Sequence, residues 1–278
     1  MRYWILILSI LCLACSKSKN SNGGDPGDPP VEEKPKVKVM TYNIYGARAS
    51  SGTPADLDMI AEVIKSENPD LVALQEVDAF TTRTGKDVHQ ARDLAKLTGM
   101  EWYFTKAMDL QGGEYGDAVL SKFPIKNATR YSLPVASGVG GETRSVALIT
   151  VEKEGKEFHF ASTHLDHLAL EDNRILQANE LKKIITSLQL PIIIAGDLNA
   201  KPESETMSII KQYLTTGCIK QCPNTFPSDN PDRTIDYILY TPINKFSVQS
   251  YNSPNGYVAS QSAYASDHRP VVAIFTLN

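Results

Sequence analysis

The chain has little cysteine, no marked excess of charge of either sign and no apolar run long enough to span a membrane. Its 278 residues include only 4 Cys, which excludes a small scaffold held together by disulfides. Lys and Arg number 28 against 32 Asp and Glu, so the chain lacks the basic excess of a dedicated nucleic-acid binder. A nuclease is still allowed, because a local basic patch is sufficient for one. Hydrophobic residues make up 42%, which is enough for a globular domain with a proper core.

The first residues are typical of an export signal. Arg2 precedes a short apolar run at residues 3–14, which is well below the roughly 20 residues of a membrane-spanning helix. The run ends in Leu-Cys-Leu-Ala-Cys-Ser, which resembles the lipobox of bacterial lipoproteins, although Cys12 replaces the Leu usual at its position. The resemblance implies that residues 1–14 are a signal peptide and that Cys15 is acylated. A plain signal peptide cut nearby is the alternative.

Residues 15–35 are predicted to be a tether. Residues 16–35 contain 4 Pro and 3 Gly and almost no apolar side chains, so they cannot offset the entropy cost of ordering. We therefore expect an exported lipoprotein, anchored to the bacterial membrane and facing the periplasm or the cell surface. Residues 36–278 form the predicted folded domain.

Strands and helices alternate loosely along this domain. Apolar positions Leu57, Ile60, Ala61 and Ile64 follow helical spacing, with Pro54 expected in the first turn and Asn68 at the end. Further helices are predicted at 88–98 and 172–188, strands at 36–44, 71–77, 191–195, 235–240 and 270–277, and a hairpin at 144–151 and 157–165. The pattern predicts an α/β sandwich with mixed sheets.

Polar residues cluster where the apolar runs stop. They are Asn43, Glu76, His164, Asp166, Asp197, Asn199, Asp236, Asp267 and His268. Glu76 and Asp236 each lie among apolar residues, and a buried ionised carboxylate needs a cation or hydrogen-bond donors. Oxygen ligands without a Cys cluster favour Mg²⁺, Mn²⁺ or Ca²⁺ over zinc.

Seven motifs in order resemble the endonuclease/exonuclease/phosphatase family. They are Thr-Tyr-Asn-Ile at 41–44, Leu-Gln-Glu-Val at 74–77, Tyr-Gly-Asp-Ala-Val-Leu-Ser at 115–121, Thr-His-Leu-Asp at 163–166, Gly-Asp-Leu-Asn at 196–199, Ile-Asp-Tyr-Ile at 235–238 and Ser-Asp-His-Arg-Pro at 266–270. One such motif is weak evidence, but seven in the family's order are specific. The resemblance implies a four-layer sandwich, with two mixed β-sheets packed face to face and helices outside.

The resemblance also implies roles for these residues. Glu76 would be the main metal ligand, with Asn43 and Asp267 as direct or water-mediated ligands. His268 would be the general base or a partner that shares a proton with the phosphate, and Asp236 would fix its tautomer.

The remaining motif residues would act on the water and the phosphate. Asp197 and Asn199 would position the attacking water and could help to hold a second metal. His164 would hydrogen-bond the non-bridging oxygens. The implied reaction is in-line attack of water on a phosphoester, with Mg²⁺ as the favoured ion and Mn²⁺ or Ca²⁺ as alternatives.

Several assignments stay open at this point. Tyr115, Arg144 and Asp166 are candidate substrate contacts, although packing or turn formation explains Tyr115 and Asp166 equally well. Asp117 stands where relatives commonly have Asn, so it binds metal, pairs with an Arg such as Arg144, or changes the tolerated substrate. Arg174 and Gln177 either border the site or lie on a solvated helix face, and Cys218 and Cys222 form a disulfide or stay free thiols. His159 and His167 lie outside the matching motifs and are predicted to be structural.

The substrate is the least determined part of the prediction. The expected rim of the site offers only Arg83, Lys86 and Arg144, which is little for a nucleic-acid track. We therefore expect a monomeric, exported phosphoesterase that acts on a phosphodiester more readily than on a monoester. The alternatives are an extracellular or periplasmic endo- or exonuclease, for which nucleic acid is a substrate only, and a catalytically silent binding lipoprotein. The pairing of a base with its orienting carboxylate argues against the silent binder.

Overall fold

The computed structural model describes residues 33–50, 52 and 54–278, and the folded unit spans residues 34–278. The predicted signal peptide, Cys15 and nearly all of the predicted tether lie outside the described residues. Within the described part of the chain, no helix is both long and apolar enough to cross a membrane.

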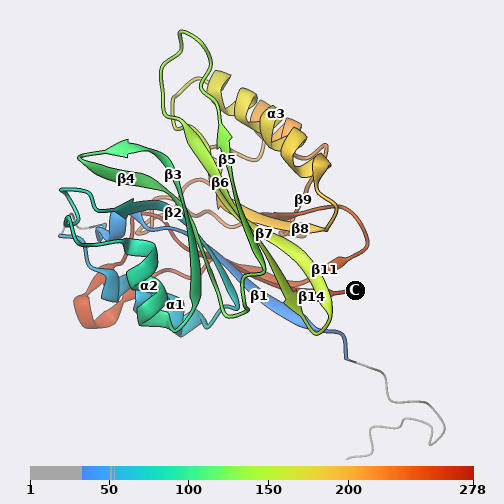
Figure 1. The fold of residues 1–278 in the computed structure, drawn as a ribbon, viewed down its shortest axis with the longest axis horizontal. Coiled ribbons are helices and arrows are strands. Elements are labelled where there is room, and N and C mark those ends of the chain that lie inside the picture. Colours follow the sequence, from blue (N-terminus) through green and yellow to red (C-terminus); the bar gives the residue numbers. More distant parts are fainter. Residues whose placement is uncertain (1–32, 51, 53) are drawn as a thin grey trace, which may run out of the picture. The chain divides into compact units, whose positions relative to one another are not determined.

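Two six-stranded sheets form the centre of the domain (Figure 1). The first has the order β11-β14-β1-β2-β4-β3, with β11 Phe246–Asn252, β14 Val271–Leu277, β1 Lys36–Asn43, β2 Leu71–Ala79, β4 Gly113–Ser121 and β3 Glu101–Leu110. The second has the order β5-β6-β7-β8-β10-β9, with β5 Asn127–Leu133, β6 Arg144–Lys153, β7 Lys156–His164, β8 Ile192–Asp197, β10 Asp236–Tyr240 and β9 Thr215–Thr216. β1–β2 and β7–β8 are parallel and the other pairs are antiparallel, so both sheets are mixed.

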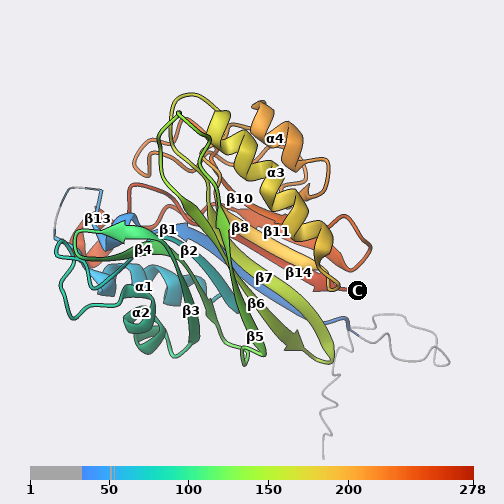
Figure 2. The ribbon, with the colours of Figure 1, turned by 45° about the horizontal axis from the view of Figure 1, so that its top comes forward.

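Helices cover the outer face of each sheet, as Figure 2 shows. α1 (Leu57–Glu67) and α2 (Gln90–Thr98) pack on the first sheet, and α3 (Asp172–Ser187) and α4 (Glu205–Ile210) pack on the second. The short elements are η1 Tyr45–Ala47, η2 Ala259–Gln261 and the pair β12 Tyr257–Val258 and β13 Ala263–Tyr264. The predicted four-layer sandwich is confirmed.

The side-chain alternation of β1 shows why the sheet is buried on both faces. Val37 and Val39 contribute to the apolar layer between the two sheets, whereas Met40 and Tyr42 pack under the helices. Because successive side chains of a strand point to opposite faces, a strand covered on both sides is apolar almost throughout. The two lysines of β1 lie at its first end, at Lys36 and Lys38, and Asn43 lies at its other end, where the strand leaves the sandwich.

Some local predictions need correction. Helix α1 begins at Leu57, with Asp56 accepting hydrogen bonds from the backbone of Asp58 at 2.9 Å, so Pro54 lies before the helix rather than in its first turn. The predicted helix end at Asn68 is confirmed, since Asn68 adopts the left-handed conformation that ends a helix. The structure also forms strands β3, β4, β5 and β11, which the sequence patterns did not predict. Cys218 and Cys222 form a disulfide, with their Cα atoms 5.3 Å apart.

Candidate active site

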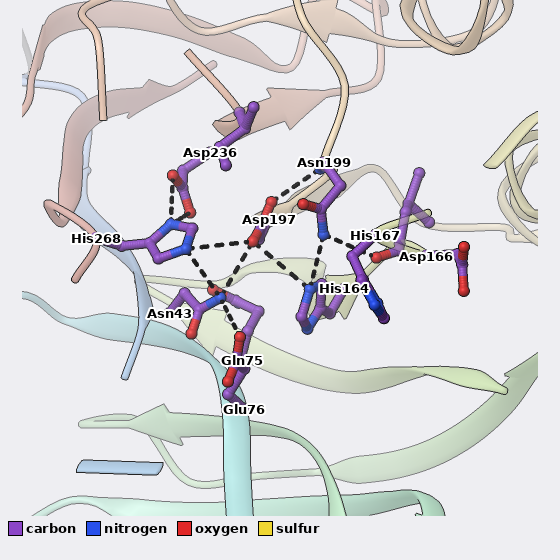
Figure 3. Close-up of polar contacts among 12 residues, drawn as sticks. Asn43, Gln75, Glu76, His164, Asp166, His167, Asp197, Asn199, Asp236 and His268 are labelled. Carbon is purple, nitrogen blue, oxygen red and sulfur yellow. Dashed lines mark hydrogen bonds and ion pairs between the residues drawn. The ribbon is translucent and has the colours of Figure 1, made fainter. Parts of the chain in front are cut away.

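The strand directions bring the polar ends of four strands to one edge of the sandwich. β7 and β8 are parallel, so His164 and Asp197 end side by side as register partners. β10 runs antiparallel to β8 and begins at Asp236, which is the register partner of Asp197. β14 runs antiparallel to β1, so the residues just before it, including His268, lie near Asn43 at the end of β1. Figure 3 shows these side chains directed toward one another.

Asn43 lies at the centre of the cluster and is fully buried. Its amide nitrogen donates to Glu76 Oε1 at 3.1 Å and to Asp197 Oδ2 at 3.1 Å, and lies 3.4 Å from His268 Nε2 (Figure 3). Its amide oxygen accepts from the backbone of Tyr45 at 3.1 Å. Since Asn43 belongs to the first sheet and Asp197 to the second, this amide joins the two sheets at the site.

A β-bulge directs Glu76 into the site. Leu74 and Val77 both pack in the cluster under α1 and α2, and the register of β2 against β4 shifts between them. Regular alternation would place Glu76 on the same helix-covered face as Leu74. Because of the bulge and a positive φ of 57° at Glu76, the carboxylate points away from that face and into the site. A positive φ is uncommon for a residue with a side chain, and such strain often marks functional positions.

His268 lies between two carboxylates. Its Nδ1 atom is 3.0 Å from Asp236 Oδ2 and 3.1 Å from Asp236 Oδ1, and its Nε2 atom is 3.7 Å from Asp197 Oδ2. Burial alone would lower the pKa of His268, but Asp236 and Asp197 outweigh burial and raise that pKa to about 10. Burial, reinforced by Asp236, raises the pKa of Asp197 to about 7. The Phe226 ring packs against the imidazole at 4.7 Å between centroids.

His164 is held in its neutral form on the other side of Asp197. Its Nε2 atom lies 3.5 Å from Asp197 Oδ2 and 2.9 Å from the amide nitrogen of Asn199, and its Nδ1 atom lies 3.1 Å from Arg144 Nη1. Burial and the adjacent Arg144 guanidinium hold the pKa of His164 well below its ordinary value. Because a guanidinium can only donate, Nδ1 of His164 accepts from Arg144 and the ring proton lies on Nε2, where Asp197 Oδ2 is the available acceptor. The Asn199 amide nitrogen beside it donates to the Leu165 carbonyl oxygen at 3.1 Å.

These side chains line a cavity of about 570 Å³. Its lining residues are Glu76, Arg83, Met108, Leu110, Tyr115, Glu142, Arg144, His164, His167, Leu168, Ala169, Arg174, Asp197, Asn199, Lys201, Phe226, Arg233, Ile235, Asp267 and His268. Tyr115 and Arg144 therefore reach the cavity, where Arg144 also pairs with Glu142 at 2.8 Å. The structure thus brings nearly all of the predicted site residues to one place.

Asp166 does not line the cavity. It is buried, and its carboxylate accepts from the backbone nitrogens of Glu142 at 2.9 Å and Leu168 at 3.0 Å. Of the two roles open for Asp166, these contacts favour the turn-forming one, in which the carboxylate joins two loops beside the site.

Asp117 lies beneath the cavity rather than in its lining. One carboxylate oxygen accepts from Ser145 Oγ at 2.6 Å, and the other has no hydrogen-bond partner. Burial raises the pKa of Asp117 to about 7, so this carboxyl group carries a proton part of the time near neutral pH. Of the three roles open for Asp117, the ion pair with Arg144 does not form, since Arg144 pairs with Glu142 and no ion pair of Asp117 occurs among the described residues.

The sequence patterns did not identify several cavity residues. His167, predicted to be structural, has a half-exposed side chain that lies 3.2 Å from Arg144 Nη2. Arg174, for which the sequence allowed either a site-bordering or a solvated position, is buried and donates to the carbonyl oxygens of Asp166 and Leu168. Phe226 belongs to no motif, and no local signal marks it. The position of His167 three residues after His164 was the one signal available for that residue.

The donor chemistry of the site fits a hard divalent cation. Glu76 and Asp267 both line the cavity, and in the described part of the chain neither has a Lys or Arg within ion-pair distance. Burial raises the pKa of Asp267, and the charge of Glu76 raises it further, so the two carboxylates repel each other. The two carboxylates offer oxygen ligands of the kind that Mg²⁺ prefers, whereas the Asn43 amide turns its nitrogen to Glu76 and its oxygen to the backbone of Tyr45. Asp197, Asp236 and His268 also offer ligand atoms within 4.8 Å of one another, although both Asp236 oxygens face His268 Nδ1.

Comparison with known proteins agrees with this geometry. Residues 40–268 match the Endonuclease/Exonuclease/phosphatase family. The chain belongs to this family. Its members hydrolyse phosphoester bonds and use divalent metals. The predicted family is therefore confirmed, whereas lipoprotein export stays a prediction.

The chain is similar to several individual family proteins. It is 30% identical over 228 residues to the uncharacterized protein F14F9.5 of Caenorhabditis elegans, covering 70% of this chain and 60% of that protein. It is 25% identical over 198 residues to nocturnin of Rattus norvegicus, covering 62% of this chain and 45% of nocturnin. The alignments thus span less than two thirds of either relative. A crystal structure from Beutenbergia cavernae with this family's name shares the fold, with a TM-score of 0.70, 24% identity, and coverage of 87% of this chain and 72% of that one.

Proposed function

We propose that this chain is an exported, metal-dependent phosphoesterase that hydrolyses a phosphodiester by in-line attack of water. The observation that carries the proposal is the convergence of Asn43, Glu76, Asp197, Asp236 and His268 in one hydrogen-bonded cluster beside a cavity. A surface for binding alone does not require an imidazole held by a buried carboxylate.

Asp197 receives the proton of the attacking water in this proposal, because the raised pKa of His268 keeps its imidazole protonated near neutral pH. Asp236 holds Nδ1 of His268, which leaves Nε2 directed toward Asp197 and Asn43. Since the Asn43 amide fixes the Asp197 carboxylate at 3.1 Å, a water between Asp197 and His268 is oriented before it reacts. The same arrangement lets His268 donate its Nε2 proton to a phosphate oxygen.

The opposite wall of the cavity binds the non-bridging oxygens of the phosphate. His164 presents the proton on Nε2, and Arg144 fixes its ring through Nδ1 at 3.1 Å. Such preorganised donors stabilise charge that builds on the phosphate oxygens in the transition state, and in enzymes of several kinds this is a leading contribution to catalysis. Tyr115 and Phe226 border the cavity and provide apolar surface for the groups attached to phosphorus.

Glu76, Asp267 and Asn43 are the residues that would hold a divalent ion. When bound, Mg²⁺, Mn²⁺ or Ca²⁺ would neutralise phosphate charge and stabilise the leaving oxygen. The two uncompensated carboxylates support this assignment, because each lacks a Lys or Arg partner among the described residues.

The size of the cavity supports a diester substrate. A volume of about 570 Å³ falls within the range of pockets that hold a small organic ligand and exceeds what a lone phosphate needs. The phosphorus can therefore carry an organic group on each side. Export, lipidation of Cys15 and a monomeric state remain part of the proposal on the basis of residues 1–35 and composition.

A phosphoester panel tests this function. We expect the purified protein to release p-nitrophenol from bis(p-nitrophenyl) phosphate with Mg²⁺ or Mn²⁺, to act more slowly on p-nitrophenyl phosphate, and to lose both activities in EDTA. Rapid degradation of plasmid DNA would favour the nuclease alternative. If no ester is hydrolysed with Mg²⁺, Mn²⁺ or Ca²⁺, the result would favour a silent binder and contradict the proposal.

A further inference from the structure

A second cavity adjoins the one that holds the site. Its volume is about 440 Å³, and its lining residues are Lys201, Pro202, Glu203, Lys211, Thr216, Cys218, Lys220, Gln221, Cys222, Asn224, Asp232, Arg233, Thr234 and Tyr237. Lys201 and Arg233 line both cavities, so the two spaces adjoin at these side chains. The disulfide between Cys218 and Cys222 fixes part of its wall.

The charge of the second cavity is positive. Four cationic side chains line it against two carboxylates, so it carries a formal charge of +2. Arg233 is neutralised by Asp232 at 2.9 Å, whereas Lys201 and Lys220 have no carboxylate within ion-pair distance among the described residues. Uncompensated ammonium groups in a concave site attract an anion.

The junction between the cavities is tied to the catalytic cluster. Lys201 follows Asn199 by two residues in the loop after β8. The Arg233 guanidinium lies 4.9 Å from the centroid of the Phe226 ring, and the same ring packs against His268 at 4.7 Å. A substrate with its reacting phosphate at His268 therefore passes these two cations if it extends into the second cavity.

We propose that the second cavity is a subsite for a second phosphate group of the substrate. The substrate class is then a small phosphodiester that carries a further phosphate away from the scissile one. This inference rests on the proposed phosphoesterase function and adds the substrate class to it. Lysines suit this task because an ammonium group binds phosphate as a point charge without demanding one geometry.

Matched chromogenic substrates test the subsite. The first pair is the 3′-(p-nitrophenyl phosphate) of thymidine with a free 5′-hydroxyl or a 5′-phosphate. The second pair is the 5′-(p-nitrophenyl phosphate) with a free 3′-hydroxyl or a 3′-phosphate. We expect the second phosphate to raise kcat/KM at least tenfold in one pair, mainly through KM. Added NaCl should reduce this advantage, because screening weakens interactions between exposed charges.

Variants separate a subsite from general charge. The double variant Lys201→Met with Lys220→Met should reduce the kcat/KM ratio of the favoured pair to about 2 or less. The control Lys183→Met removes an exposed lysine of α3 that pairs with Glu180, and it should keep the wild-type ratio. Equal kcat/KM within both pairs, or a ratio that the double variant leaves unmoved, would overturn the subsite while the phosphoesterase function stands.

Binding is measured as well, so that the subsite can be judged without turnover. If none of the four esters is hydrolysed, the proposed function fails. Calorimetry with thymidine 3′,5′-bisphosphate and thymidine 5′-monophosphate then decides on the subsite. Tighter binding of the bisphosphate by at least tenfold, lost in the double variant, supports it, and equal affinities contradict it.

Discussion

Replacing the orienting carboxylate of His268 tests the chemistry of the site in detail. The change Asp236→Asn keeps the size of the side chain and removes its charge. In the wild-type protein both Asp236 oxygens lie within 3.1 Å of His268 Nδ1, so this nitrogen carries a proton that the carboxylate accepts. An amide at this position can instead donate to Nδ1, which would leave a neutral ring with its one proton on Nε2 and remove the imidazolium that Asp236 stabilises.

The expected magnitude follows from this contact. Opposite unit charges about 4 Å apart attract by about 4 kcal/mol at the effective dielectric constant of ~20 that suits protein sites. The variant therefore loses most of the stabilisation of an imidazolium at His268. In a serine protease triad, the corresponding change of carboxylate to amide costs about 10⁴ in kcat because the tautomer is wrong. We expect a loss of about 10²- to 10⁴-fold in kcat here, with KM changed by less than about threefold.

Two measurements check this expectation. Steady-state hydrolysis of bis(p-nitrophenyl) phosphate gives kcat and KM, and ¹⁵N chemical shifts of the His268 ring show which nitrogen carries the proton. Asp87→Asn is the matched control, because Asp87 is exposed and does not line the cavity. Wild-type kcat in Asp236→Asn, or a ring proton that stays on Nδ1 while kcat falls, would refute the orienting role.

Three further predictions concern the metal, pH and packing. Glu76→Gln should weaken Mg²⁺ binding in calorimetry by at least tenfold, and unchanged affinity would remove Glu76 from the ligand set. Burial lowers the pKa of His89, whose Nδ1 accepts from the backbone of Arg92 at the start of α2. The unfolded chain therefore binds the proton more readily, and stability is lost as pH falls below about 6.5. Urea unfolding at pH 7.5 and 5.0 should show a smaller loss in His89→Asn, which caps without titrating, and an equal loss would contradict this. Gly196→Ala should lower the unfolding free energy by about 3 kcal/mol or prevent folding, since its Cβ would lie 1.8 Å from the Thr163 carbonyl oxygen; a wild-type Tm would show that the strands can separate.

The elements that the sequence predicted correctly are those with strong local signals. Strand β8 is apolar from Ile192 to Ala195 because both of its faces are covered, β1 has the β-branched and aromatic residues typical of strands, and helix α1 has helical spacing with a left-handed end at Asn68. Strand β4 was not predicted, since it carries Gly113 and Gly116 in a pattern that local propensity does not favour. Gly116 is required by packing, because a Cβ there would lie 1.9 Å from the Thr105 carbonyl oxygen across the neighbouring strand.

The site was predictable to the extent that its residues occur in short motifs. Asn43, Asp197 and His268 follow or precede strands, and strand direction then places them at one edge. The bulge that redirects Glu76 could not be predicted, because it depends on how β2 pairs with β4. Phe226 likewise reaches the cavity through the path of a long loop, which no local pattern specifies.

Anomalous scattering from a crystal grown with Mn²⁺ tests the central claim most directly. If the converging strand ends form a metal-dependent hydrolytic site, a strong anomalous peak should lie within ligand distance of Glu76 and near Asp267 and Asn43. The peak should disappear in Glu76→Gln. A crystal saturated with Mn²⁺ that shows no peak in this cavity, or a peak held only by Asp197, Asp236 and His268, would contradict the account.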